Sequence, residues 1–219
     1  MPNPAPTAPT APSDAPRASR RPREIDDLTL ARAKRGDGAA LRSLIEHHER
    51  AVFALLSRML VARASASLVE DLAQETFLKM CVALPRFDVS GPARFSTWLL
   101  TIAARTALDA CKKSGREGRH LSIAPLDDDE SGPRARPSPA ARERADASLA
   151  RREARDRVSR AAERLSDDQR LVLLLAEWHG FSHQEIARAL DVEEGTVKSR
   201  LSRAKEHMRR ALTEDAHGS

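Results

Sequence analysis

The amino-acid sequence predicts an all-α protein of two small helical domains joined by a flexible linker, the second containing a helix-turn-helix. Apolar residues recur at steps of three and four, and neither an alternating strand pattern nor a hairpin signal occurs. Aromatic residues make up only 3% of the chain. Its cores must therefore be built from Leu, Ala, Val and Ile, which favours small helical units.

The first helical domain is expected over residues 25–113. Helices are predicted at about 26–35, 38–61, 67–84 and 96–113, with Pro85 ending the third and a loop over 86–94. Ser67 and Glu70 have the spacing of a capping box, so they are expected to begin the third helix.

The second helical domain is expected over residues 143–212, with helices at about 146–164, 167–179, 182–190 and 194–212. Ser166 with Gln169, and Ser182 with Glu185, form two further capping boxes. Outside the two domains we expect a disordered tail at 1–23, a flexible linker at 114–142 and a polar tail at 213–219.

Charge and cysteine content limit the classes of function. The net charge of +5 and the pI of about 9.7 permit a nucleic-acid partner. Two isolated cysteines indicate a reducing compartment, and no apolar run is long enough to span a membrane. The Pro-rich start lacks the apolar core of a secretory signal, so we expect a soluble, cytoplasmic protein without a membrane partner.

Residues 182–205 carry the strongest functional signal, two short helices joined by a tight turn. In the second helix Val197, Leu201, Ala204 and Met208 form an apolar stripe, and residues 195–210 hold six Lys or Arg and one acid. A solvated basic face is the alternative. The residues that we expect to contact duplex DNA are Thr196, Lys198, Ser199, Arg200, Arg203 and Lys205.

The helix near 67–84 has a second distinctive face. Asp71, Gln74, Glu75 and Leu78 share the side opposite its core positions. An apolar side chain among three polar ones suits a protein contact, although a face that binds nothing is the alternative.

The sequence offers no catalytic or metal-binding constellation. His47 and His48 point apart on a helix, and Gly180 breaks the helix between His179 and His183. The acidic run at 127–130 lacks the pattern of a calcium loop, and no Gly-rich phosphate cradle or nucleophile motif occurs. We therefore expect no enzyme activity, no metal and no cofactor.

Four motifs occur in a recognisable order, at 71–78 (DLAQETFL), 95–103 (FSTWLLTIA), 165–170 (LSDDQR) and 195–201 (GTVKSRL), after an Arg35-Gly36-Asp37 segment. With them the chain resembles a bacterial extracytoplasmic-function (ECF, group 4) sigma factor, the smallest branch of the primary sigma family. The resemblance covers about residues 25–113 and 145–212.

The resemblance implies roles for particular residues. Domain two of such a factor docks on the clamp helices of the largest polymerase subunit, and its docking face matches Asp71, Gln74, Glu75 and Leu78. The positions implied for the −10 promoter strand are Arg86, Phe87, Asp88, Arg94, Arg105 and Lys112. Trp98 is either a stacking residue or a core residue.

Two positions depart from the family pattern. Many relatives carry Asn where this chain has Arg105, which leaves its −10 preference open, and His183 replaces a frequent Tyr. In the family the linker threads past the active-site cleft, where its acidic run could mimic nucleic acid or act as a solvated spacer.

The resemblance implies an alternative sigma factor that directs core RNA polymerase to specific promoters, under anti-sigma control in response to a stress or envelope signal. One alternative is a helix-turn-helix regulator that acts apart from the polymerase. Another is a protein whose sigma-like domains titrate an anti-sigma factor.

Overall fold

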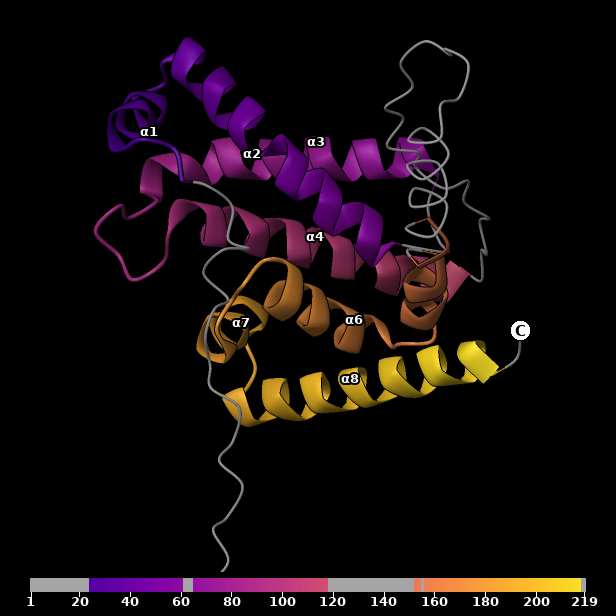
Figure 1. The fold of residues 1–219 in the computed structure, drawn as a ribbon. Helices are drawn as coiled ribbons and strands as arrows, with labels where there is room; N and C mark the ends of the chain where they lie inside the picture. The colour runs from indigo at the N-terminus through magenta and orange to yellow at the C-terminus, as the bar shows by residue number, and fades with distance from the viewer. Residues whose placement is uncertain (1–23, 61–64, 118–151, 155, 218–219) are drawn as a thin grey trace, which may run out of the picture.

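The computed structural model of the protein describes residues 24–60, 65–117, 152–154 and 156–217 (Figure 1). These residues form helices and turns, with no strand among them, so the predicted all-α class is confirmed. The predicted tail at 1–23 and most of the predicted linker lie outside the described residues. Among the helices that are described, none is long and apolar enough to cross a membrane.

The N-terminal domain contains α1 (Asp27–Lys34), α2 (Gly38–Met59), α3 (Ala66–Ala83) and α4 (Phe95–Glu117), with a 3₁₀ turn, η2 (Leu84–Arg86), after α3. Asp26 and Asp37 cap α1 and α2 by accepting hydrogen bonds from backbone N–H groups of the first turn. The backbone bond from Ala40 and the ion pair with Arg32 hold the pKa of Asp37 below its usual value. Because α4 continues to Glu117, residues 114–117 are helical and do not belong to the linker.

The cap of α3 differs from the prediction. Ser65, not Ser67, is the N-cap residue, and its hydroxyl accepts a bond from the Leu68 N–H at 3.3 Å. Ser67 lies inside the helix, where its hydroxyl pairs with that of Ser65 at 2.7 Å. The helix therefore starts two residues earlier than the Ser67–Glu70 spacing predicts.

The C-terminal domain contains helical residues at 156–163, then α6 (Asp167–Leu173), a π-helical turn η3 (Leu174–Trp178), α7 (His183–Leu190) and α8 (Glu194–His217). The capping boxes at Ser166 and Ser182 are both present. The helix predicted over 167–179 is not uniform, because its second half is the π-helical turn. The polar tail predicted from 213 is helical as far as His217.

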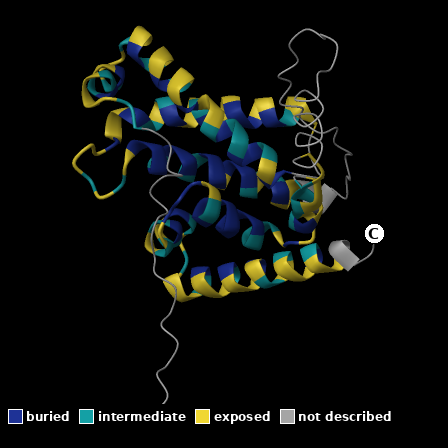
Figure 2. Cartoon of the chain, in the orientation of Figure 1, coloured by how far each residue is buried: buried dark blue, intermediate teal, exposed yellow. Residues whose placement is uncertain are grey.

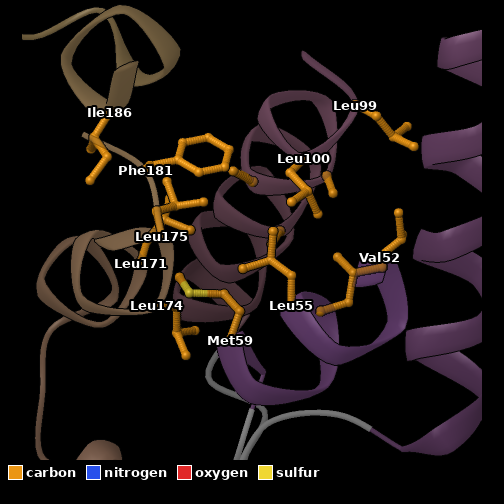
Figure 3. Packing of buried hydrophobic residues seen from close by; sticks show 14 of the residues in the cluster. Val52, Leu55, Met59, Leu99, Leu100, Leu171, Leu174, Leu175, Phe181 and Ile186 are labelled. Atoms are coloured by element: carbon orange, nitrogen blue, oxygen red, sulfur yellow. The ribbon is translucent and has the colours of Figure 1, made fainter. Parts of the chain in front are cut away.

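The two domains pack against one another through a shared apolar core (Figures 1 and 2). Figure 3 shows Leu171 and Leu175 turned toward Met59 and Leu55 of α2, and Phe181 toward Leu100 of α4. All of these side chains are no more than 1% exposed. Burying side chains of this size contributes about 1.5–3 kcal/mol each, so the association of the domains is driven mainly by the hydrophobic effect.

Two arginines form hydrogen bonds between the domains. Arg170 of α6 is 2% exposed, and its guanidinium donates to the carbonyl oxygen of Met59 at the end of α2 at 3.0 Å. Arg105 of α4 donates from Nε to the carbonyl oxygen of Ala189 in the last turn of α7 at 2.9 Å. Both bonds thus end on backbone acceptors near the C-terminus of a helix in the other domain.

Candidate functional site

An exposed stripe along α3 carries the four side chains that the sequence predicts to contact a protein. Asp71, Gln74, Glu75 and Leu78 are all exposed, opposite the buried residues Val69, Leu72, Ala73, Thr76 and Met80. Leu78 leaves 67% of its surface accessible. The stripe therefore combines two carboxylates, an amide and an apolar side chain on one face.

Val82 extends this stripe by one helical turn, although the sequence-based prediction stopped at Leu78. It is 83% exposed, the largest fraction recorded for a large apolar side chain in the described residues. The i, i+4 spacing from Leu78 is the signal that would have identified it. Two adjacent exposed apolar side chains suit a partner that covers them with an apolar surface of its own.

The carboxylates of the stripe differ in their surroundings. Glu75 pairs with Lys79 at 2.7 Å, and the ammonium of Lys79 also donates to Thr106 Oγ1 at 3.1 Å. Within the described residues Asp71 makes no ion pair. Asp71 is therefore the carboxylate more readily available to an arginine or lysine of a partner.

A second stripe runs along α4. Arg94, just before the helix, and Arg105 and Lys112 within it lie within about a 20° arc at about 100° per residue. All three are exposed. This places three of the cations implied for −10 DNA in one line, which suits the phosphates of an extended strand.

The loop before α4 is divided between surface and core. Arg86 and Asp88 are exposed, whereas Phe87 is 7% exposed, with its ring 4.9 Å from that of Trp98 and 5.5 Å from that of Phe95. A ring buried among other rings cannot stack on a base in this conformation. Phe87 is therefore placed as a core residue, against the role implied by the resemblance, and Trp98 packs in the same cluster.

Asp88 has a structural partner of its own. Its carboxylate accepts a bond from the Ser90 N–H at 2.9 Å, which fixes a tight turn in the loop. The loop thus presents Arg86 and Arg94 from a turn anchored by Asp88 and by the buried ring of Phe87.

The helix-turn-helix is formed by α7, a three-residue connection and α8. The Ser182 hydroxyl accepts from the Glu185 N–H at 3.2 Å while the Glu185 carboxylate accepts from the Ser182 N–H at 2.7 Å, which fixes the start of α7. Asp191 ends α7 in the left-handed conformation with φ 54°, unusual for a residue other than glycine. This C-cap turns the chain sharply into α8.

Ion pairs hold both flanks of α8 against the rest of the domain. Arg200 pairs with Asp168 of α6 at 2.9 Å, and Lys205 pairs with Glu177 of η3 at 2.8 Å. A third predicted DNA contact, Lys198, pairs with Glu194 one turn earlier at 2.8 Å. The Lys198 ammonium lowers the pKa of Glu194 by hydrogen bonding and by its charge.

The outer arc of α8 is more open. Ser199 and Arg203 are exposed, Thr196 is half-buried, and the Ser199 hydroxyl donates to the Thr196 carbonyl at 3.1 Å. Figure 2 shows exposed residues along the outer edge of this helix as far as its grey last turn. Of the four predicted cations on α8, Arg203 is the one for which the structure gives no ion pair within the described residues.

The histidines that the structure describes are spread over several elements. In the described part of the chain no group of three or more His, Cys, Asp or Glu side chains is arranged to hold a metal ion. His179 ends η3, and burial, with the nearby Arg58 cation, lowers its pKa to about 4.

Comparison with known families matches both domains. The family model described as Sigma-70 region 2 matches residues 44–117, and that described as Sigma-70, region 4 matches residues 155–208.

Relatives match nearly the whole chain. The RNA polymerase sigma-H factor of Pseudomonas aeruginosa is 32% identical over 190 residues, which are 86% of this chain and 94% of that protein. The ECF RNA polymerase sigma-E factor of Escherichia coli K12 is 32% identical over 185 residues, 83% of this chain and 91% of that protein.

Solved structures share the fold. The sigma factor RpoE of Bartonella quintana, in complex with the anti-sigma factor NepR, aligns with a TM-score of 0.58 at 22% identity over 78% of this chain and 96% of that one. CnrH in complex with the cytosolic domain of CnrY aligns with a TM-score of 0.54 at 21% identity over 86% of this chain and 97% of that one. Taken with the sequence relatives and the two matched regions, these findings show that the chain belongs to the ECF sigma factors of bacterial RNA polymerase.

Proposed function

We propose that the N-terminal domain binds the clamp helices of the largest polymerase subunit through α3 and binds the −10 strand along α4. In the C-terminal domain, α8 recognises the −35 element as duplex DNA. The observation that carries this proposal is that one chain exposes two chemically different helical faces. The α3 stripe is acidic and apolar, whereas the outer side of α8 is hydroxylic and basic.

For the polymerase contact, Asp71 and Glu75 supply carboxylates for basic groups of the clamp, with Gln74 between them. Leu78 and Val82, 67% and 83% exposed, supply the apolar part. Fully covering a side chain of this size contributes about 1.5–3 kcal/mol, so this pair gives the contact much of its affinity.

For the promoter, Arg86, Arg94, Arg105 and Lys112 supply cations to the −10 strand, and Asp88 holds the loop. On α8, Arg203 and Arg200 are the candidates for base edges, with Thr196, Lys198, Ser199 and Lys205 holding phosphates. The ion pairs of Arg200 and Lys205 must loosen, or be shared with the DNA, for these two side chains to make such contacts.

The wider role follows from the family. We propose that the chain is a group 4 factor, that it acts in the cytoplasm where the polymerase and promoters are, and that it catalyses no reaction itself. We also propose that an anti-sigma factor restrains it, since RpoE of Bartonella quintana, which shares the fold, is known in such a complex. A regulator that acts apart from the polymerase is disfavoured by membership of this family.

The test is a reconstitution with core RNA polymerase. The chain is expected to co-elute with core and to start transcription at defined sites, and mapping those start sites would give both promoter elements. Reversing charge with Asp71→Lys and Glu75→Lys is expected to abolish co-elution. Glu70→Lys is the matched control, since Glu70 is also exposed on α3 but lies outside the stripe. Co-elution of the double variant at the wild-type level would refute the assigned face.

A further inference from the structure

The three ion pairs of α8 differ in the kind of cation that each one holds. Lys198 and Lys205 end in an ammonium group, which is a compact point charge with no plane of its own. Arg200 ends in a planar guanidinium with five N–H donors in a fixed fork. A lysine therefore suits a phosphate, whereas an arginine recognises the two acceptors of a guanine edge when its plane is held in the right orientation.

Arg200 is also the most enclosed of these three cations. Its side chain is 27% exposed, against 59% for Lys198 and 46% for Lys205. Its Nη2 lies 2.9 Å from Oδ2 of Asp168, and in the part of the chain that the structure describes no second partner is given for the guanidinium. One nitrogen is thus engaged by the protein, while the N–H groups of the other two are available to a base.

Asp168 is itself firmly held. It lies in the first turn of α6, whose start is fixed by the capping box between Ser166 and Gln169. On the same helix Leu171 and Val172 are fully buried in the core. The carboxylate therefore projects from an element that cannot shift without disturbing the core, which is what a group that orients another side chain requires.

We propose that Asp168 is a positioning residue for base recognition: it orients the Arg200 guanidinium toward one base pair of the −35 element and stays bound to it in the complex. The inference rests on the function proposed above, because the contact of α8 with duplex DNA comes from there. Arg203, three residues further on, has no ion pair within the described residues. Arg200 is thus expected to select its base pair more strictly than Arg203 does.

Orienting the guanidinium acts differently on matching and non-matching sequences. On the matching base pair Arg200 arrives already ordered, so less conformational entropy is lost on binding. On another sequence the same ion pair keeps the cation from the phosphates, which would accept it whatever the sequence. The Asp168 carboxylate, an anion near DNA, therefore lowers affinity for every duplex but lowers it least for the one that carries the matching base.

The test measures base preference as well as affinity. The full chain, alone and bound to core polymerase, is mixed with a library of duplexes that contain a randomised segment, and the bound and unbound fractions are sequenced. Asp168→Asn is expected to raise affinity for random sequence and to lower the preference at one base pair about tenfold, within the discrimination that one arginine–guanine contact supplies. Arg200→Ala is expected to lower the preference at that same base pair.

A double variant separates positioning from a general effect of charge. When Arg200 is already alanine, adding Asp168→Asn is expected to have no further effect on the preference at that base pair, because the side chain that Asp168 orients is gone. Glu194→Gln is the matched control, since Glu194 is 46% exposed, Asp168 is 45% exposed, and each pairs with one cation of α8. It is expected to raise affinity for all sequences and to leave every base preference unchanged, because the lysine that it releases contacts phosphate.

Three results would overturn the inference: an Arg200→Ala variant that keeps every base preference, an Asp168→Asn variant that keeps the preference which Arg200→Ala loses, or an Asp168→Asn variant that relaxes several positions at once, as a displaced helix would. A chain that selects no sequence, alone or with core, would refute the −35 part of the proposed function together with the inference. A chain that never joins core would refute the polymerase contact alone, because selection by the unbound chain still compares the variants.

Discussion

Replacing Arg170 with methionine is expected to cost about 3–5 kcal/mol of stability, the range measured when one partner of a buried charged network is removed. Arg170 is 2% exposed and donates to the carbonyls of Met59, Ala162, Glu163 and Leu165 at 3.0 to 3.2 Å. Methionine fills similar space without a donor, so these four carbonyls and the Asp167 carboxylate lose the arginine, although Ala162 O keeps the bond from the Leu165 N–H. Each buried group left unsatisfied costs about 1–3 kcal/mol. Water reaching some of them keeps the total within the stated range.

The assay is equilibrium unfolding in urea. A loss of about 4 kcal/mol moves the midpoint by more than about 1 M, since the urea dependence is about 1–3 kcal/mol per M. Arg164→Met is the control, because Arg164 is 58% exposed and pairs with the similarly accessible Glu214, so its replacement is expected to cost less than about 1 kcal/mol. The loss of stability for Arg170→Lys should lie between those for Arg170→Met and Arg164→Met. A cost below about 1 kcal/mol for Arg170→Met would show that the carbonyls do not depend on this arginine.

Four further outcomes are expected. Acid should destabilise the protein, because burial lowers the pKa of His48 to about 4 from an ordinary 6.5. Between pH 4 and 6.5 the folded state therefore binds fewer protons than the unfolded state. About 1–2 kcal/mol is then lost from pH 7.5 to 5, and His48→Phe should flatten a urea titration over that range. Asp191→Gly should leave stability unchanged or raise it, whereas Asp191→Ala should cost about 1 kcal/mol, because the position has φ 54°. Asp168→Asn should strengthen duplex binding, because it frees the Arg200 cation and removes a carboxylate. In a fluorescence titration the slope of log affinity against log salt should steepen by about one unit, and an unchanged slope would contradict this. Leu78→Asp should weaken core binding at least about tenfold in an affinity measurement without changing the unfolding midpoint, since its side chain is exposed.

Local chemistry explains which parts of the fold the sequence predicts. The Ser166 and Ser182 caps are predicted correctly because both partners of a capping box lie within one turn. The same reasoning fails near Ser67, because Ser65 stands two residues earlier and takes the cap. The buried and exposed sides of α3 are predicted because helical periodicity alone separates Leu72 from Leu78.

Features that depend on distant residues are not predicted. The sequence predicts Phe87 to be a loop residue after Pro85, and no local signal indicates that the rings of Phe95 and Trp98 pack against it. The π-helical turn after Leu173 likewise has no sequence signature that we identified. The bond of Arg105 to Ala189 joins residues 84 apart, so only the packing of the two domains reveals it.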